Sequence, residues 1–287
     1  MLENVEKVIQ KAKKGKYAIP QFNINDSTSA KFILEVCEEK KAPVILGCSE
    51  GALKYMGGPT VAVNLVKGLI KDLNITIPVI LHLDHGQSIA SCKKAIDAGF
   101  TSVMYDGSTL PIEQNVKNTI EVVEYARKHN ATVEAEVGTV GGTEDGITGG
   151  VRYASLDECI KMSKTGISML AASLGSVHGF YHGEPKLGFT EMETYAKETN
   201  LPLVLHGGSG IPDDQIKRAI MSGEAKININ TEIQNAFNQG IAKYYKEKLN
   251  LNETGYMLKN ITGKYAIPFA KAIVAEKIEL FGNYNKA

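Results

Sequence analysis

Two imidazoles and a carboxylate crowd the end of one apolar stretch of the chain. The segment PVILHLDHG, residues 78–86, begins as an apolar run and then places His82, Asp84 and His85 within four residues. Burying such polar groups without partners costs free energy. These side chains are therefore expected where a strand leaves the core and meets a pocket, with His82 packed beside the others or supporting them.

Three histidines far apart in the chain are each followed by glycine: His85, His178 and His206. Imidazole nitrogens suit zinc, and a catalytic zinc ion keeps three protein ligands and one open position. Each histidine taken alone could equally be a packed core or loop residue. Three together favour a metal site, because a neighbouring glycine lets the backbone and a ligand approach closely.

Two later segments, HGGSG (206–210) and NINT (228–231), are typical of an anion-binding turn. Backbone N–H groups at a glycine turn before a helix bind phosphate, and Ser209 and Thr231 add hydroxyl groups. A Gly-rich turn with a capping serine is an equally good interpretation from composition alone. The position of both segments at the seventh and eighth predicted strands favours the phosphate site.

The segment GTVGGTEDGITGG (138–150) has the composition of a mobile lid. Its acidic residues, Glu144 and Asp145, lie among glycines. They are either solvated loop charges or catalytic groups delivered when the lid closes, and composition does not separate the two.

The elements that must position these residues alternate between short apolar strands and helices. The expected strands are 17–23, 43–49, 78–84, 101–106, 131–138, 166–173, 201–208 and 225–231. The expected helices are 2–14, 26–39, 60–72, 88–98, 111–128, 155–164, 190–198 and 212–222, with 232–248 and 265–281 near the C-terminus. Strands that are continuous apolar runs are typical of parallel strands buried on both faces.

Eight strand–helix units without a break in composition predict one (β/α)₈ TIM barrel over residues 1–287, with an extra N-terminal helix and C-terminal helices. An open doubly wound sheet is the weaker alternative. It would need a Gly-rich phosphate loop after the first strand, and QFNINDS is not such a loop.

Catalytic groups of such a barrel gather at the carboxyl ends of the strands. The polar residues at these ends, or in the loops after them, are Gln21, Asn23, Ser49, Asp84, His85, Asp106, Glu134, Glu136, His178, His182, His206, Asn228, Asn230 and Thr231. With His82 near the end of the third strand, five of the six histidines belong to these ends or loops, and His129 lies on the opposite side. Such a concentration favours one shared site.

The composition argues against several classes of protein. Lys plus Arg equals Asp plus Glu, at 32 each, so charge does not point to nucleic acid or an acidic membrane surface. The four cysteines form no CxxC pair, which fits a reducing compartment. The charged N-terminal stretch and the lack of any run of ~18 uncharged apolar residues predict neither a signal peptide nor a membrane span. A cytoplasmic protein that acts on a small molecule is expected.

Long motifs in order along the chain resemble one enzyme family, the class II, zinc-dependent fructose-1,6-bisphosphate aldolases. They are YAIPQFNIN, SEGALKYMGG, VILHLDHG, AGFTSVMYDGS, VEAEVGTVGGTEDG, LGSVHGFYHGEPKL, LPLVLHGGSGIP, KININTE and FGNYNKA. The resemblance implies reversible cleavage of fructose 1,6-bisphosphate to dihydroxyacetone phosphate and glyceraldehyde 3-phosphate through a zinc-stabilised enediolate.

The resemblance also implies roles for individual residues. His85, His178 and His206 would bind Zn²⁺, and Glu136 would hold the metal in an alternative position. Asp84 would act as acid and base at the C4 hydroxyl, and Glu144 would take the C3 proton of the dihydroxyacetone phosphate half. The residues expected to bind substrate and phosphate are Asn23 and Ser49 on the aldehyde side, with Gly179, His182, Gly207, Gly208, Ser209, Asn228, Asn230 and Thr231. A monovalent cation (Na⁺ or K⁺) near the phosphate and a homodimer or homotetramer are further expectations.

Two departures from the family pattern concern the phosphates. His182 stands where many relatives have a lysine, and the charge of an imidazole changes close to neutral pH. No arginine follows Arg218, whereas many relatives use a C-terminal arginine for the second phosphate. Lys264 or Lys271 could substitute as a point charge rather than a fork.

Other functions were weighed against this one. HGGSG rather than HGAS favours fructose 1,6-bisphosphate over tagatose 1,6-bisphosphate or 6-phospho-5-dehydro-2-deoxygluconate, although EAEVGTVGG and GGVRYA also resemble aldolases of the last substrate. A Schiff-base aldolase would want a lysine on the sixth strand, and GISMLAAS has none. A metal-dependent hydrolase would show HxH on the first strand, and YAIPQFN contains no histidine. A non-catalytic barrel would not need Asp84 and Glu144.

Overall fold

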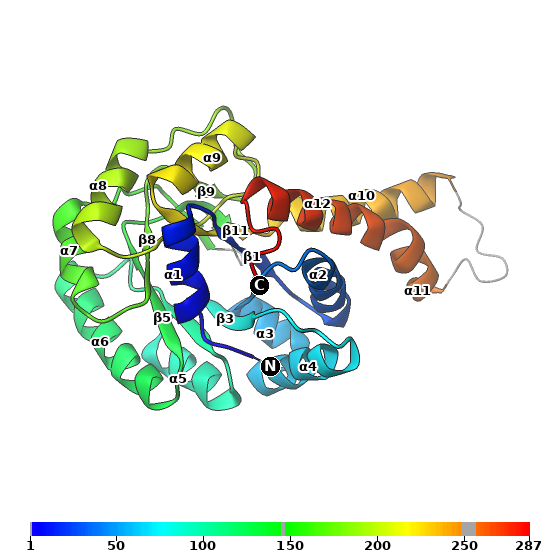
Figure 1. Cartoon of the computed structure of the whole chain (residues 1–287), viewed down its shortest axis with the longest axis horizontal. Helices are drawn as coiled ribbons and strands as arrows, with labels where there is room; N and C mark the ends of the chain where they lie inside the picture. Colours follow the sequence, from blue (N-terminus) through cyan, green and yellow to red (C-terminus); the bar gives the residue numbers. More distant parts are fainter. Residues whose placement is uncertain (1, 145–146, 248–256) are drawn as a thin grey trace.

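The chain folds into a closed barrel of parallel strands surrounded by helices (Figure 1), which confirms the predicted TIM barrel. The computed structural model describes residues 2–144, 147–247 and 257–287, with the backbone alone at 143, 144 and 147–149. Within these residues the barrel strands are β1 (Ile19–Asn23), β2 (Val44–Ser49), β3 (Val79–Gly86), β4 (Ser102–Tyr105), β5 (Thr132–Val137), β8 (Met169–Ala172), β10 (Leu203–Leu205) and β11 (Glu224–Ile229). They pair in the order β1-β11-β10-β8-β5-β4-β3-β2.

Helices cover the outer face of this barrel. They are α1 (Glu6–Gly15), α2 (Ser27–Glu39), α3 (Glu50–Met56), α4 (Pro59–Asp72), α5 (Ile89–Ala98), α6 (Ile112–Lys128), α7 (Leu156–Ser163), α8 (Phe189–Thr199), α9 (Asp213–Ser222), α10 (Thr231–Glu247), α11 (Leu258–Ile261) and α12 (Ile267–Leu280). Side chains cap the start of α2, α3, α5 and α7. Asp26, Ser88 and Ser155 form capping boxes at α2, α5 and α7. A π-helical turn, η1 (Thr262–Ala266), joins α11 to α12.

Helix α1 closes the end of the barrel opposite to the candidate site. Its Val8, Ile9 and Ala12 join a buried cluster with inward-facing strand residues such as Ile19 and Ile80. This helix begins at Glu6 rather than at the predicted residue 2. Leu2 instead forms a parallel bridge with Val79, so the first residues of the chain pair with the start of β3.

Three other boundaries correct the sequence prediction. Helix α3 follows Ser49 directly, because the Ser49 hydroxyl accepts the Ala52 N–H and starts a helix where a loop was expected. The predicted strand 201–208 is ordered as a strand only over Leu203–Leu205. The expected loop 138–150 contains two antiparallel strands, β6 (Gly141–Glu144) and β7 (Ile147–Gly149).

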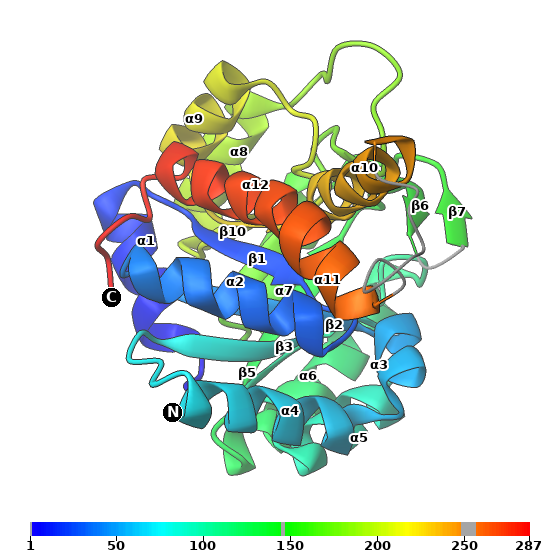
Figure 2. The same ribbon diagram turned by 90° about the vertical axis from the view of Figure 1, so that its right-hand side faces the viewer.

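The C-terminal helices form an arm that projects from the barrel (Figures 1 and 2). Helices α10 and α12 pack along each other. Gly240 of α10 lets the turn η1 approach closely, because a Cβ there would lie 2.3 Å from the Tyr265 carbonyl oxygen. In Figure 2 α12 also lies beside α2. Among the described residues, no helix is long and apolar enough to cross a membrane.

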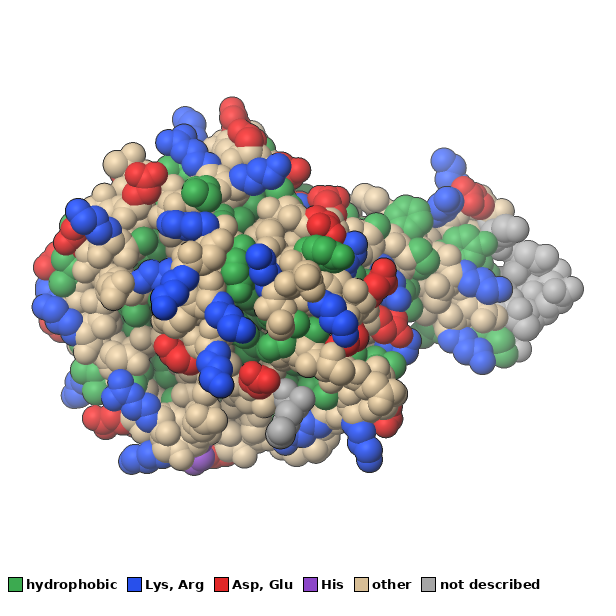
Figure 3. Space-filling model, in the orientation of Figure 1, with side chains coloured by type: hydrophobic (Ala, Val, Ile, Leu, Met, Phe, Trp, Pro, Cys, Tyr) green, Lys and Arg blue, Asp and Glu red, His purple; other side chains and the backbone are tan. Residues whose placement is uncertain are grey.

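Charged side chains of both signs are interspersed over the face of the molecule shown in Figure 3. This pattern agrees with the formal net charge of +0. The visible face therefore presents no extended field of one sign that would attract a polyanion.

Candidate active site

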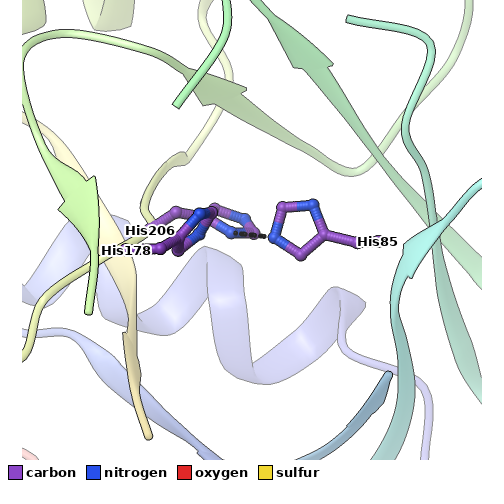
Figure 4. Close-up of side chains that lie close together, drawn as sticks. All are labelled: His85, His178 and His206. Atoms are coloured by element: carbon purple, nitrogen blue, oxygen red, sulfur yellow. Dashed lines mark hydrogen bonds between the residues drawn. The ribbon is translucent and has the colours of Figure 1, made fainter. Parts of the chain in front are cut away.

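Three histidines from three different strands meet at the carboxyl end of the barrel (Figure 4). His85 comes from β3, His178 from β9 (Val177–His178), and His206 directly follows β10. Their ring centroids lie 4.7 to 5.9 Å apart, and one nitrogen of each ring lies within 4.8 Å of the others. The structure thus brings the three predicted ligands to one point.

A bulge in β3 lets neighbouring residues share this site. The pairing with β4 shifts by one residue between Leu83 and Gly86, and His85 has a left-handed backbone with φ of 48°. In a regular strand, Asp84 and His85 would point to opposite faces. The extra residue and the positive φ turn the His85 ring back toward the site, so that both side chains reach it.

Carboxylates fix the orientation of two of the rings. His85 Nδ1 lies 2.9 Å from Asp106 Oδ2, and His206 Nε2 lies 2.7 Å from Glu134 Oε1. The opposite nitrogens, His85 Nε2 and His206 Nδ1, therefore face each other at 3.0 Å. Histidines that bind metals commonly have a carboxylate on the second nitrogen, and two ligands of a tetrahedral zinc are about 3.3 Å apart. The donor set thus fits a metal ion.

Glu134 belongs to a polar network inside the barrel, beneath the histidines. Its Oε2 pairs with Lys226 Nζ at 2.8 Å and lies 3.7 Å from His82 Nε2, and all three side chains are fully buried. Burial would raise the pKa of Glu134, but Lys226 and His206 hold it well below its usual range. Burial lowers the pKa of His82 to about 3, and its Nδ1 lies 2.8 Å from Ser102 Oγ. His82 is thus a neutral supporting residue.

Two more carboxylates lie near His85, and their surroundings shift their pKa values in opposite directions. Burial alone would raise the pKa of Asp106, but His85 and the Ser108 hydroxyl and N–H hold it well below its usual range. Glu136 is buried next to them, with Oε2 3.8 Å from His85 Nδ1, and burial and the Asp106 charge raise its pKa to about 8. His85, Asp106 and Glu136 could hold a metal as a second group.

Asp84 occupies the wall of a cavity of about 180 Å³ next to the histidines. Asn23 Nδ2 donates to Asp84 Oδ2 at 3.0 Å, and Asn228 Nδ2 lies 3.5 Å from Oδ1. The carboxylate is 1% exposed, so these amides rather than bulk water hold it. It is positioned to exchange a proton with a molecule in the cavity.

The opposite wall of this cavity is made of glycine turns and a helix start. Gly179, Gly207, Ser209, Asn230 and Thr231 line it, together with His178 and Gln234. Gly207 has φ of 64°, and a Cβ there would lie 2.2 Å from the Val177 carbonyl oxygen. The Ser209 hydroxyl accepts the Glu232 N–H, so its own proton can point to an anion at the N-terminus of α10.

The remaining predicted site residues lie elsewhere. Ser49 caps α3 outside this cavity, although it pairs in register with Asp84. Gly208 packs against β11, where a Cβ would lie 2.6 Å from Ile227 Cγ2. His182 is exposed in the loop after β9 and lines a neighbouring cavity, which shares His178 and Gly179 with the first. The side chain of Glu144 and all of Asp145 lie outside the described residues, and their roles stay predictions.

The segment predicted to be a lid forms a strand, β6, beside His178. Gly141 and Gly142 of β6 pair in parallel with Val177 and His178 of β9. A Cβ on Gly142 would lie 2.2 Å from the His178 carbonyl oxygen, so glycine is needed for this approach. The segment therefore supports the His178 corner directly.

Sequence reasoning left some functional neighbours without a role. Asp106 and Glu134 were recognised as strand-end acids but not as partners of the ligand histidines. Lys226 and Gln234 were missed altogether. A lysine within the apolar strand AKINI was the available signal, because a buried lysine requires a carboxylate partner.

Comparisons with known proteins agree with this geometry. The sequence profile of the family described as "Fructose-bisphosphate aldolase class-II" matches residues 3–286. The chain is 52% identical to a fructose-bisphosphate aldolase of Geobacillus stearothermophilus, over 100% of this chain and 99% of that protein. It is 49% identical to a 6-phospho-5-dehydro-2-deoxy-D-gluconate aldolase of Bacillus subtilis (strain 168), over 99% and 97%.

A solved structure gives the same result. The crystal structure of the YdjI aldolase from Escherichia coli K12 superposes with a TM-score of 0.86 at 30% identity and covers 100% of both chains. With matches of this extent in both sequence and structure, the chain belongs to the class II fructose-bisphosphate aldolase family, whose members are lyases that are generally metal-dependent.

Proposed function

We propose that this aldolase cleaves fructose 1,6-bisphosphate reversibly to dihydroxyacetone phosphate and glyceraldehyde 3-phosphate, with Zn²⁺ bound by His85, His178 and His206. One observation carries the proposal. His178 of the histidine cluster, the carboxylate of Asp84 and the Gly-rich turn line the same small cavity. A ketose phosphate needs these three elements together: a carbonyl ligand, a proton acceptor and a phosphate site.

The residues divide the chemistry between them. A bound Zn²⁺ would act as a Lewis acid that polarises the ketone carbonyl of the substrate. Asp84 takes the proton of the C4 hydroxyl as the C3–C4 bond breaks, since the amides of Asn23 and Asn228 hold its oxygens toward the cavity. Glu144, as the resemblance implies, exchanges the C3 proton of the dihydroxyacetone phosphate half.

The phosphate of this half lies against the turn of β10 and the first turn of α10. Gly207 and Gly179 bring backbone groups close to the cavity, while Ser209 and Thr231 supply hydroxyl groups. The N-terminal end of the 17-residue helix α10 adds a favourable dipole for an anion. A monovalent cation next to this phosphate is part of the proposal.

A Schiff-base mechanism fits the site less well. The lysine nearest the histidines in the network, Lys226, is fully buried and ion-paired with Glu134 beneath them. A nucleophilic lysine must instead be neutral and reach the substrate. The metal mechanism therefore has the better-placed groups.

The test is a cleavage assay on the full-length chain, in which dihydroxyacetone phosphate is measured with and without metal. Chelation should abolish activity and added Zn²⁺ should restore it. Activity that survives complete metal removal, or that borohydride traps with substrate, would contradict the zinc mechanism.

Two other substrates are tested in the same assay. The match to a 6-phospho-5-dehydro-2-deoxy-D-gluconate aldolase makes that compound the second candidate, and tagatose 1,6-bisphosphate is the third. A kcat/KM for either that is well above that of fructose 1,6-bisphosphate would replace the leading substrate. A homodimer or homotetramer in the cytoplasm completes the proposal, and sedimentation of the purified chain measures the assembly.

A further inference from the structure

A second cavity adjoins the first and has no assigned role. It has a volume of about 140 Å³ and lies between the N-terminal end of α2 and the first turns of α10. Asn23 and Gln234 line both cavities, so the two meet at these side chains. A ligand that is anchored at the phosphate turn and passes Asp84 can extend into this second cavity.

The polar groups of the second cavity are mostly amides. Gln234 Nε2 donates to Asn230 Oδ1 at 2.6 Å, which leaves Gln234 Oε1 as an acceptor. Asn25 and Asn238 add two more side-chain amides, for which no protein hydrogen bond occurs within the described part of the chain. Amides both donate and accept, so they suit the hydroxyl groups of a sugar chain.

The hydrocarbon part of a sugar also has a partner here. Phe32 of α2 and Phe237 of α10 both line the cavity, and their rings are stacked with centroids 6.4 Å apart. Amide groups beside an apolar floor are a common arrangement in small-molecule pockets.

The described residues of this cavity offer no cationic partner to a second phosphate. Among its described lining residues there is no lysine, arginine or histidine, and the charged one is Asp26, which caps α2 through the Ser29 N–H at 2.7 Å. Lys271, one substitute that the sequence offered for the missing arginine, pairs with Glu35 at 2.7 Å. Lys264, the other, belongs to η1 and does not line the cavity. A phosphate placed here would face a carboxylate without a compensating cation.

We propose that this second cavity binds the aldehyde half of the substrate and recognises its hydroxyl groups rather than a terminal phosphate. The substrate class is therefore ketose 1-phosphates, whose distal end is uncharged, alongside the bisphosphate. The inference rests on the proposed aldolase function and on the first phosphate lying at the Gly207 turn. The aldehyde released from this class is an uncharged polyhydroxyaldehyde.

The first test compares kcat/KM for fructose 1-phosphate and fructose 1,6-bisphosphate with the zinc-loaded full-length chain at fixed ionic strength. A charged partner for the second phosphate would favour the bisphosphate by about 10- to 100-fold. We expect the two values to agree within about tenfold, and a larger preference for the bisphosphate would overturn the inference. Cleavage of neither compound would contradict the proposed function itself, and this inference with it.

The second test adds a positive charge to the second cavity. Asn238 is exposed on α10 and lines the cavity, whereas the neighbouring exposed residue Gln239 does not. Asn238→Lys should shift the kcat/KM ratio about tenfold toward the bisphosphate, and Gln239→Lys, which adds the same charge outside the cavity, should leave the ratio unchanged. Equal ratios in the two variants would show that the distal end does not reach this cavity.

A half-reaction checks that the first cavity is intact in both variants. Exchange of the C3 proton of dihydroxyacetone phosphate with D₂O, followed by NMR, requires only the first half of the substrate. Gln239→Lys should exchange at the parental rate, and retained exchange in Asn238→Lys would place its shift in substrate preference in the second cavity. Loss of exchange in Asn238→Lys would mean that the substitution acts on the metal cavity, and would overturn the assignment of two separate subsites.

Discussion

The buried ion pair beneath the metal site makes a sharp prediction about stability. Lys226 and Glu134 are 2.8 Å apart and both are 0% exposed. At an effective dielectric constant of about 20 their attraction is about 6 kcal/mol, which offsets a desolvation cost of several kcal/mol for each ion. The pair is thus nearly neutral for stability, but either partner alone is costly.

Lys226→Met removes the cation and leaves a buried carboxylate without compensation. We expect the free energy of unfolding to fall by about 3–5 kcal/mol, a large part of the roughly 5–15 kcal/mol that holds a domain folded. The double variant Lys226→Met, Glu134→Gln removes the charge as well and should recover to within about 1–2 kcal/mol of the parent. The assay is urea unfolding of the metal-free chain at neutral pH, followed by circular dichroism.

A surface pair provides the control. Lys161 and Asp157 are 2.9 Å apart on α7 but are 44% and 75% exposed. Lys161→Met should leave the free energy of unfolding nearly unchanged, because water screens an exposed pair. If Lys226→Met costs no more than Lys161→Met, or if the double variant is no more stable than Lys226→Met alone, the reasoning about the buried charge is wrong.

The same variant reports on the metal site. Without Lys226, burial raises the pKa of Glu134, so the carboxylate is a weaker partner for His206. Its hydrogen bond to His206 Nε2 then weakens, and zinc affinity should fall by about 10- to 100-fold. Competition with a chromogenic chelator measures this loss.

Three further predictions concern other parts of the structure. Asp84→Ala should retain zinc in metal analysis while kcat/KM falls by about 10²–10⁴, and loss of the metal would show that Asp84 is structural. Glu38 accepts backbone N–H groups from the turn before β3, which together with Lys41 lower its pKa to about 2 despite burial. Because the folded pKa of Glu38 is depressed, its contribution to the free energy of unfolding is complete above the usual pKa of 4.5 and is lost as pH falls toward 2. Glu38→Ala should therefore lower the free energy of unfolding by about 1–2 kcal/mol at pH 7 and by much less near pH 2. The control Glu39→Ala, at an exposed position, should lower it little at either pH. Gly207→Ala should destabilise the chain by about 2–4 kcal/mol and raise KM, because the residue has φ of 64° and no room for a Cβ; an unchanged KM would argue against a phosphate at this turn.

The sequence was sufficient for the parts of the fold that depend on local pattern. Apolar runs such as VILHLD are continuous because the strands are buried on both faces, so their number and order predicted the barrel. The three histidines that cluster in the structure were singled out because each precedes a glycine at a strand end or in the loop after it, and their role as metal ligands stays a prediction. Asp26 likewise marked the start of α2 through its capping box.

The parts that the sequence did not predict depend on contacts between distant segments. The strands β6 and β7 lie in a Gly-rich stretch without strand propensity and are ordered by pairing with each other and with β9. Helix α3 was not among the predicted helices, and its start depends on the Ser49 hydroxyl, which accepts the Ala52 N–H. The partners of Glu134 lie 72 and 92 residues away, and no local pattern relates them.

The bulge in β3 has a consequence for how the protein trades stability against activity. The left-handed backbone of His85 is less strained in glycine, so His85→Gly would relax the strand at the expense of a metal ligand. Because Asp84 and His85 are adjacent on this kinked segment, a movement of the proposed ligand would also move the proposed proton acceptor.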